Sequence, residues 1–138
     1  MSKAHKEVIR SWVEEAINKG NLSVLDELVH SNYVYRNGSE TLHGPETVKG
    51  LIAAYRAAFP DLKLRIDDLV SEGDKTVNCF TITGTHQGDF MGIAATGKQV
   101  EIKGVVLSRF DTGKIIEEWE ILDQLAMFQQ LGVVSLPA

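Results

Sequence analysis

The spacing of the apolar residues changes once along the chain, near Pro60. Before this proline, apolar residues recur every three or four positions, which is the spacing of one face of an α-helix. After it, apolar and polar residues mostly alternate, as they do along a β-strand whose two faces differ. The pattern therefore predicts a helical first part and a second part made of strands.

Two amphipathic helices are predicted in the first part. The apolar face of the first is formed by Val8, Ile9, Trp12, Val13, Ala16 and Ile17. Gly20 follows as its end, because glycine readily adopts the conformation that ends helices. The other helix begins at Pro45, a residue favoured in the first helical turn, and ends at Pro60. A short helix over 22–29 and a brief strand over 33–36 are expected between them.

Four strands and a closing helix are predicted in the second part. The strands cover 62–72, 76–89, 98–111 and 114–123, and the helix covers 125–131. Gly73-Asp74 and Thr112-Gly113 are turn sequences that join neighbouring strands as hairpins. This order predicts an α+β fold in one domain over 1–138, with a strongly curved antiparallel sheet wrapped around the N-terminal helices as a cone-shaped barrel. Such a cone encloses a pocket for a small molecule.

Charge and composition narrow the possible partners. The chain has 138 residues, with 14 Lys and Arg against 19 Asp and Glu, so its formal net charge is -5. This balance argues against nucleic acid and against an anionic membrane surface, because both attract basic proteins. The sequence has no run of about 18 apolar residues and no apolar signal segment at its start, so a cytoplasmic location is expected.

Motifs for metal or cofactor chemistry do not occur in the sequence. No cysteine and histidine pair has the spacing of zinc ligands, and the glycines do not form a phosphate-binding loop. The Gly-x-Ser-x-Gly motif of a serine nucleophile is missing as well. We therefore expect no zinc site, no phosphate-binding loop and no serine nucleophile of this type.

The strand over 114–123 contains one candidate acid/base residue. Trp119, Ile121 and Asp123 share one face of this strand, and Glu118 and Glu120 share the other. We expect the first face to point inward and the second to lie in water, so that Asp123 ends an apolar row. A carboxyl in apolar surroundings can exchange protons near neutral pH. Alternatively, Asp123 caps the helix that follows it, and the spacing leaves both interpretations open.

His86 and Arg109 are further candidates. His86 follows Gly84 on the predicted inner face of its strand, where it either donates a hydrogen bond to a substrate carbonyl or is a partly buried histidine bonded to backbone. Arg109 lies on the face opposite to Val106, and Val106 is expected to point inward. Arg109 is therefore expected to point outward, into an ion pair or a subunit contact.

The predicted outer face of the sheet is unusually apolar for a surface in water. It includes Val77, Thr81, Thr83, Val105 and Leu107. A contiguous apolar and β-branched surface of this kind favours contact with another protein chain. We predict a homo-oligomer, in the simplest case a two-fold dimer, that forms through this face.

Several short motifs occur in a fixed order along the chain. The second half contains His86-Gln-Gly-Asp-Phe-Met-Gly-Ile, Ala-Thr96-Gly97-Lys98, Arg109-Phe-Asp-Thr-Gly113-Lys114-Ile115, Glu117-Glu-Trp119-Glu-Ile-Leu-Asp123-Gln and Gln129-Gln-Leu131-Gly132. The first half adds Asn18-Lys-Gly20, the strand around Tyr33, and His43-Gly44-Pro45. Together they resemble the SnoaL-like polyketide cyclases of the nuclear transport factor 2-like superfamily, over nearly the whole chain.

The resemblance implies a cofactor-free intramolecular aldol ring closure in an apolar pocket. Asp123 matches the position of the family's acid/base aspartate, and His86 matches a histidine that orients or polarises the substrate. The residues expected to contact a small apolar molecule are Trp12, Tyr35, Phe59, Met91, Val106 and Trp119. Cyclases of this kind tend to have an asparagine in place of Tyr35 and a histidine in place of Val106, so an aromatic polyketide substrate is not implied.

The sequence therefore leaves two classes of function. The first is a cyclase, or a related isomerase or hydrolase, that acts on a small apolar carbonyl compound with Asp123 as acid/base and His86 assisting. The second is a non-catalytic small-molecule binding protein with the same fold, in which Asp123 is only a helix cap.

Overall fold

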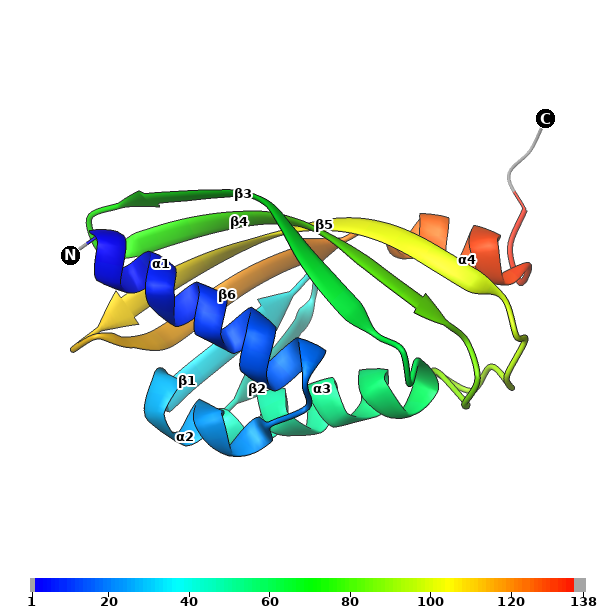
Figure 1. The fold of residues 1–138 in the computed structure, drawn as a ribbon, viewed down its shortest axis with the longest axis horizontal. Helices are drawn as coiled ribbons and strands as arrows, with labels where there is room; N and C mark the ends of the chain where they lie inside the picture. Colours follow the sequence, from blue (N-terminus) through cyan, green and yellow to red (C-terminus); the bar gives the residue numbers. More distant parts are fainter. Residues whose placement is uncertain (1, 136–138) are drawn as a thin grey trace.

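A mixed sheet of six strands, in the order β2-β1-β6-β5-β4-β3, is the frame of the molecule (Figure 1). The computed structural model describes residues 2–135, with side chains from residue 4 onward. The antiparallel meander consists of β3 (Lys63–Glu72), β4 (Lys75–Thr85), β5 (Gln99–Asp111) and β6 (Lys114–Leu122). The glycine turns predicted between β3 and β4 and between β5 and β6 are confirmed, since Gly73 and Gly113 both have positive φ angles, +59° and +82°.

The sheet extends past β6 by two further strands. β1 (Val29–Asn37) pairs with β6 in parallel, and β2 (Glu40–His43) pairs with β1 as an antiparallel hairpin. The predicted α+β class is confirmed, while the prediction that all strands are antiparallel is wrong for this one pair. β1 arrives from the helical layer rather than through a hairpin from β6, so no tight turn forces the two strands to run in opposite directions. The two ends of the sheet, β2 and β3, do not pair, and the curved sheet stays open.

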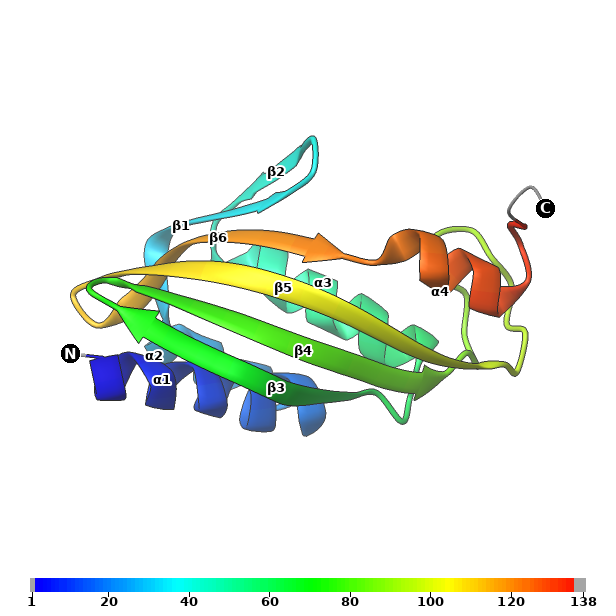
Figure 2. The same ribbon diagram turned by 90° about the horizontal axis from the view of Figure 1, so that it is seen from above.

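The helices cover the concave face of the sheet (Figure 2). α1 (Ser2–Ser11) continues into a π-helical segment, Trp12–Asn18, and the predicted apolar face of this helix is buried against the sheet. α3 (Pro45–Ala58) lies beside it on the same face, with Val48 and Ile52 buried. A 3-10 turn, Leu22–Val24, and the short α2 (Leu25–Leu28) connect the first helix to β1.

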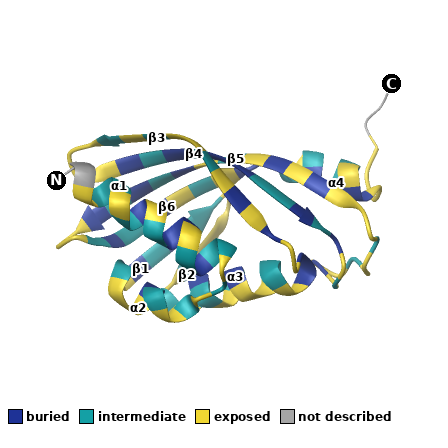
Figure 3. Cartoon of the chain, in the orientation of Figure 1, coloured by how far each residue is buried: buried dark blue, intermediate teal, exposed yellow. Residues whose placement is uncertain are grey.

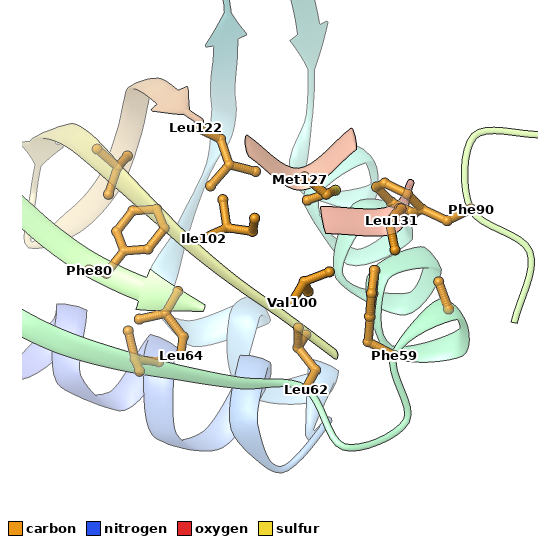
Figure 4. Close-up of a cluster of buried hydrophobic side chains, with 13 residues drawn as sticks. Phe59, Leu62, Leu64, Phe80, Phe90, Val100, Ile102, Leu122, Met127 and Leu131 are labelled. Atoms are coloured by element: carbon orange, nitrogen blue, oxygen red, sulfur yellow. The ribbon is translucent and has the colours of Figure 1, made fainter. Parts of the chain in front are cut away.

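α4 (Gln124–Leu131) closes one end of the curved sheet. Its Met127 and Leu131 join Phe59 and Phe90 in a buried apolar cluster (Figure 4). Gly132 follows with a φ of +83°, so the predicted glycine stop of this helix is confirmed. No helix within residues 2–135 combines the length and the apolar character needed to cross a membrane.

Buried residues alternate with exposed ones along the long strands (Figure 3). The outer face of the sheet nevertheless exposes large apolar side chains, among them Val105, Trp119 and Ile121. Thr81, also expected on this face, is buried, and its hydroxyl donates a hydrogen bond to Oδ2 of Asp67 at 2.6 Å. The sheet therefore has an apolar inner face and a partly apolar outer face.

Candidate active site

The inner face of β6 carries two carboxyl groups. Glu118 is only 5% exposed, Glu120 lines the cavity described below, and Leu122 continues the same face. Trp119 and Ile121 point outward, and Ile121 is 76% exposed. The prediction that the face with Trp119 points inward and the face with Glu118 lies in water is therefore wrong.

A β-bulge contributes to this orientation. Arg109 of β5 pairs with Glu117 of β6, whereas the next residue, Phe110, pairs with Ile115, so Ile116 is an extra residue in β6. Because of this extra residue, Ile115 and Glu118 are both buried although they are not an even number of positions apart. Trp119 is apolar but lies outside, where the guanidinium of Arg36 packs over its ring at 5.5 Å.

Asp123 is exposed and lies outside this inner face. It is the N-cap of α4, and its Oδ1 accepts a hydrogen bond from the backbone N–H of Ala126 at 3.1 Å. The prediction that Asp123 is buried at the end of an apolar row is wrong, and the alternative that it caps the following helix is confirmed. Asp123 is exposed because side chains alternate between the two faces of β6, so that Leu122 points inward and the next residue, Asp123, points outward.

A cavity lies between the concave face of the sheet and the helices. Its free volume is about 90 Å³, and most of its lining is apolar. Its polar lining comes mainly from Tyr35, Tyr55, Asn78, Glu118 and Glu120. Asp123 does not contribute to it. Among the described residues, Glu118 and Glu120 are the carboxyl groups that line this cavity.

Glu118 is fully engaged in hydrogen bonds with the protein. Tyr33 donates to its Oε1 at 2.7 Å, and Ser108 donates to its Oε2 at 2.5 Å. Burial raises the pKa of the Glu118 carboxyl to about 7, against the opposing effect of the two hydroxyl donors. With both oxygens occupied, this residue holds β1, β5 and β6 together beside the cavity.

Glu120 has only one oxygen engaged. Tyr35 donates to its Oε1 at 2.5 Å, and Asn37 in turn donates to the Tyr35 hydroxyl at 3.1 Å. Within residues 4–135, no donor is bonded to the second oxygen, Oε2. Burial raises the pKa of Glu120, and the Tyr35 hydrogen bond partly offsets this rise. A carboxyl with a raised pKa and a free oxygen in an apolar cavity is suited to accept and return a proton.

β4 ends at Thr85, before the predicted end of this strand at residue 89, so His86 follows the strand; it is buried, as predicted, but it does not line the cavity. The backbone N–H of Thr96 donates to its Nδ1 at 3.2 Å, and the Thr96 hydroxyl lies 3.0 Å from the same nitrogen. Its ring packs against Phe59 with 5.5 Å between centroids. This geometry is that of a buried histidine bonded to backbone, which fixes the loop after β4, and a catalytic role for His86 stays a prediction.

The residues predicted to contact a substrate divide into two groups. Trp12, Tyr35 and Val106 line the cavity. Phe59 belongs to the apolar cluster near α4, Met91 is 65% exposed in the loop between β4 and β5, and Trp119 lies on the outer face. Substrate binding by the first group stays a prediction. For Met91 and Trp119, the predicted place in the pocket is wrong, since hydrophobicity alone does not tell inside from outside.

Arg109 points outward, as predicted. Its Nε lies 3.0 Å from Glu117, and both side chains sit on the outer face of the sheet. Among the described residues 2–135, no three His, Cys, Asp or Glu side chains are grouped closely enough to hold a metal ion.

The pairing of tyrosines with glutamates was missed in the sequence. Tyr33 and Tyr35 alternate on β1, Glu118 and Glu120 alternate on β6, and each tyrosine bonds one glutamate. Two Tyr and two Glu with the same spacing on strand-like segments were a signal for this arrangement. It could not be used without knowing that β1 and β6 are neighbours.

Comparison with known proteins places the chain among cyclase relatives. Residues 7–131 match the model of the SnoaL-like polyketide cyclase family. Aklanonic acid methyl ester cyclase DnrD from Streptomyces peucetius is 27% identical over 131 residues, which cover 91% of this chain and 89% of the relative. A second aklanonic acid methyl ester cyclase, DauD from Streptomyces sp. (strain C5), is 26% identical over 131 residues, which cover 91% of this chain and 80% of the relative.

Solved structures share the fold. AclR from Streptomyces galilaeus, a proposed hydroxylase, superposes with a TM-score of 0.88 at 29% identity, over 99% of this chain and 87% of its own. TsrD from Streptomyces laurentii superposes with a TM-score of 0.88 at 28% identity, over 96% of this chain and 97% of its own. The open curved sheet with helices on its concave face is thus common to these proteins.

Proposed function

Because the chain belongs to the SnoaL-like polyketide cyclase family, we propose that it catalyses an aldol-type ring closure on a small apolar carbonyl compound, with Glu120 as the acid/base residue. The observation that carries this proposal is the Glu120 carboxyl, half-buried in an apolar cavity with one oxygen bonded to Tyr35 and the other free. Glu120 thereby takes the role that the family resemblance suggested for Asp123.

The reaction needs one proton to move twice. The Glu120 carboxylate takes a proton from the carbon beside a carbonyl group, and the C–H electron pair forms the C=C bond of an enolate while the carbonyl π pair moves to oxygen. The enolate carbon then attacks a second carbonyl of the same molecule and closes the ring. The protonated Glu120 returns its proton to the new alkoxide, so the carboxylate is regenerated.

The cavity supports this chemistry through its low polarity. Burial favours the protonated form of Glu120, which makes its carboxylate a stronger base than an exposed carboxylate. The free volume of about 90 Å³ is smaller than an engineered cavity of about 150 Å³ that binds benzene, so even a one-ring guest requires the lining side chains to move apart. A molecule as large as the aklanonic acid methyl ester of the two relatives requires a larger rearrangement.

Non-catalytic binding of a small molecule is the second candidate function. It is favoured by the apolar character of the cavity and by Val106, an apolar lining residue at the position where the family resemblance implies a histidine. A binding protein does not need the free oxygen of Glu120, so proton transfer separates the two candidates.

The test is hydrogen–deuterium exchange of one-ring aryl ketones and β-keto esters in D2O. NMR measures the exchange rate of each compound with the protein and compares it with the rate without protein. We expect the wild-type protein to accelerate exchange at the carbon beside the carbonyl. Glu120→Gln should reduce this acceleration by about 100-fold or more, the usual contribution of a general base. Asp123→Asn, which keeps a capping side chain, should leave it unchanged.

Each other outcome has a defined meaning. Loss of exchange in Asp123→Asn with full exchange in Glu120→Gln would return the acid/base role to Asp123. Ligand binding without any acceleration of exchange by the wild-type protein would favour the binding protein.

A further inference from the structure

Tyr55 contributes a phenol hydroxyl to the wall of the cavity. It follows Val48, Leu51 and Ile52 on the side of α3 that lines this cavity, at the spacing of one helical face. Its ring is half-buried and packs against Phe90 with 5.1 Å between centroids, which limits its rotation. The helix and this neighbour therefore hold the Tyr55 hydroxyl in place.

The hydroxyl of Tyr55 differs from those of the other two tyrosines in the chain. Tyr33 donates to Glu118, and Tyr35 donates to Glu120. The Tyr55 hydroxyl donates to no acceptor within residues 4–135. Tyrosine hydroxyls in apolar surroundings usually have a hydrogen-bond partner. The Tyr55 hydroxyl is therefore a donor that the cavity keeps available for a guest molecule.

Tyr55 and Glu120 share one end of the cavity. α3 packs against β1, which carries Tyr35, and the Tyr35 hydroxyl is bonded to Glu120. Burial raises the pKa of Tyr55 to about 12, and the negative charge of Glu120 adds to this rise. Burial also raises the pKa of Tyr35, with a smaller contribution from Tyr55. The free donor of Tyr55 and the free oxygen of Glu120 can therefore meet the same guest.

Asn78, another polar residue of the cavity wall, is less suited to this task. It pairs with Val106 of β5, which pairs with Glu120 of β6, so the backbones of Asn78 and Glu120 are about 10 Å apart. Its unpaired buried atom is Oδ1, an acceptor, which cannot bond a carbonyl oxygen. In an aldol reaction the carbonyl oxygen is bonded to the carbon next to the one that loses its proton. The donor to this oxygen must therefore lie close to Glu120.

We infer that the Tyr55 hydroxyl donates a hydrogen bond to the substrate carbonyl oxygen beside the C–H group that Glu120 deprotonates. This inference rests on the proposed function and adds a second catalytic residue to it. Glu120 takes the proton, the C–H electron pair forms the C=C bond, and the carbonyl π pair moves to the oxygen that Tyr55 contacts. The hydrogen bond stabilises the enolate more than the ketone. Tyr55 keeps its own proton, and the second carbonyl of the substrate is left for ring closure.

The first test is a binding measurement with acetone labelled with carbon-13 at its carbonyl. Its four non-hydrogen atoms suit a free volume of about 90 Å³, since about 150 Å³ holds the six of benzene. A hydrogen bond to the oxygen withdraws electron density from the carbonyl carbon, so its NMR signal should move downfield on binding to the wild-type protein. In Tyr55→Phe this shift should be lost, while saturation transfer from the protein still detects bound acetone.

Tyr33→Phe is the matched control for this measurement. It removes the same hydroxyl group from a tyrosine that is fully buried, bonds Glu118 and does not line the cavity. The carbonyl shift of bound acetone should therefore be the same in Tyr33→Phe as in the wild-type protein.

The second test is the deuterium exchange of methyl acetoacetate, a β-keto ester with two carbonyl groups. Tyr55→Phe should lower kcat of exchange by about 100-fold, the usual effect of losing one donor to a developing oxyanion. KM should change much less, because the donor acts mainly on the enolate. A residue that only shapes the cavity would change KM instead.

Three outcomes overturn the inference: no binding of acetone to the wild-type protein, the same carbonyl shift in Tyr55→Phe as in the wild-type protein, or full exchange in Tyr55→Phe where Glu120→Gln loses it. Failure of the proposed function has a different signature. In that case the wild-type protein does not accelerate exchange, or Glu120→Gln leaves the rate unchanged, while the acetone shift still reports whether Tyr55 donates to a carbonyl.

Discussion

Glu118 and Glu120 are alternate residues on the same strand, yet their side chains have different surroundings. Each oxygen of Glu118 accepts one hydroxyl hydrogen bond, from Tyr33 and from Ser108, so neither oxygen is left without a protein donor. Glu120 is bonded by Tyr35 alone. Burial raises the pKa of both groups, and the two differ in that only Glu120 keeps one oxygen without a hydrogen-bond donor among residues 4–135.

The raised pKa of Glu118 predicts how stability depends on pH. Burial raises this pKa from 4.5 to about 7, so the folded state binds the proton more tightly than the unfolded chain does. Its contribution to stability is therefore complete below about pH 4.5 and is lost as the pH rises through 7. Between these limits the change amounts to at most about 4 kcal/mol, since one pKa unit corresponds to about 1.4 kcal/mol.

Urea unfolding at pH 4.5 and pH 8 tests this prediction. Glu118→Gln cannot ionise, so its stability relative to the wild-type protein should increase between the two pH values. Glu14→Gln, at an exposed position of the first helix, is the control for the loss of one charge. The same pH dependence in Glu118→Gln and in the wild-type protein would contradict the prediction.

Tyr35 is predicted to set the pH range in which Glu120 works. Its hydrogen bond lowers the pKa of Glu120 and so opposes the effect of burial. Tyr35→Phe removes this bond, and the pKa of Glu120 should rise further. The acid limb of the pH–rate profile for deuterium exchange should then move to higher pH. An unchanged profile would mean that the Tyr35 hydroxyl does not act on the reacting group.

At the level of elements, the helices and long strands could be predicted from the sequence because each has a regular pattern. Helices that meet the sheet with one face keep their apolar residues at helical spacing, as Trp12 and Val13 do. β6 is different, because its outer face carries the apolar Trp119 and Ile121 while its inner face carries Glu118 and Glu120. Hydrophobicity therefore could not tell its two faces apart.

Two other features of the sheet depend on contacts that no local pattern encodes. The extra residue at Ile116 becomes visible only in the pairing of β5 with β6, and the partner of β1 is known only once the chain is folded. The candidate site depends on both. Tyr35 reaches Glu120 because β1 adds to β6 in parallel, so the pairing of these two side chains could not be predicted from sequence alone.

Asp123 is predicted to matter for α4 rather than for chemistry. Its side chain accepts the Ala126 N–H in the first turn of this helix. Asp123→Ala should lower the free energy of unfolding by about 1 kcal/mol, the usual cost of losing an N-cap. Asp123→Asn should cost less, because asparagine also caps helices. Chemical denaturation of the two variants checks this order, and an equal loss in both would contradict the capping role.

Gly104 is required for the close packing of β5 against its neighbours. A Cβ atom at this position would lie 2.6 Å from Cζ of Phe80 and 2.9 Å from Cδ1 of Leu122, and both side chains line the cavity. Gly104→Ala should therefore cost about 1–3 kcal/mol of stability, as overpacked core substitutions do. Gly50→Ala is a control, because a Cβ there meets open space and alanine favours the helix. Thermal unfolding measures both, and an unchanged Gly104→Ala would show that the two side chains give way freely.

For the whole molecule, the outer face of the sheet is the surface that most needs a partner. Val105 and Ile121 expose apolar area at its centre, beside a groove that also contains Lys103 and the carboxylates of Asp67 and Asp123. This arrangement has both signs of charge around an apolar centre. We propose that a second copy of this chain covers the face about a two-fold axis, with Lys103 of one copy facing the carboxylates of the other.

The dimer predicted on this basis can be tested by sedimentation with two matched substitutions. Ile121→Lys places a charge at the centre of the face, where the side chain is already 76% exposed in one copy, so the fold should be unaffected while the dimer dissociates. Met91→Lys makes the same kind of change at a position that is 65% exposed in the loop between β4 and β5, and it should leave the dimer intact. A monomeric wild-type protein at micromolar concentration would rule out this assembly. A dimer that survives Ile121→Lys but not Met91→Lys would place the interface at the loop, beside the segment that His86 holds in place.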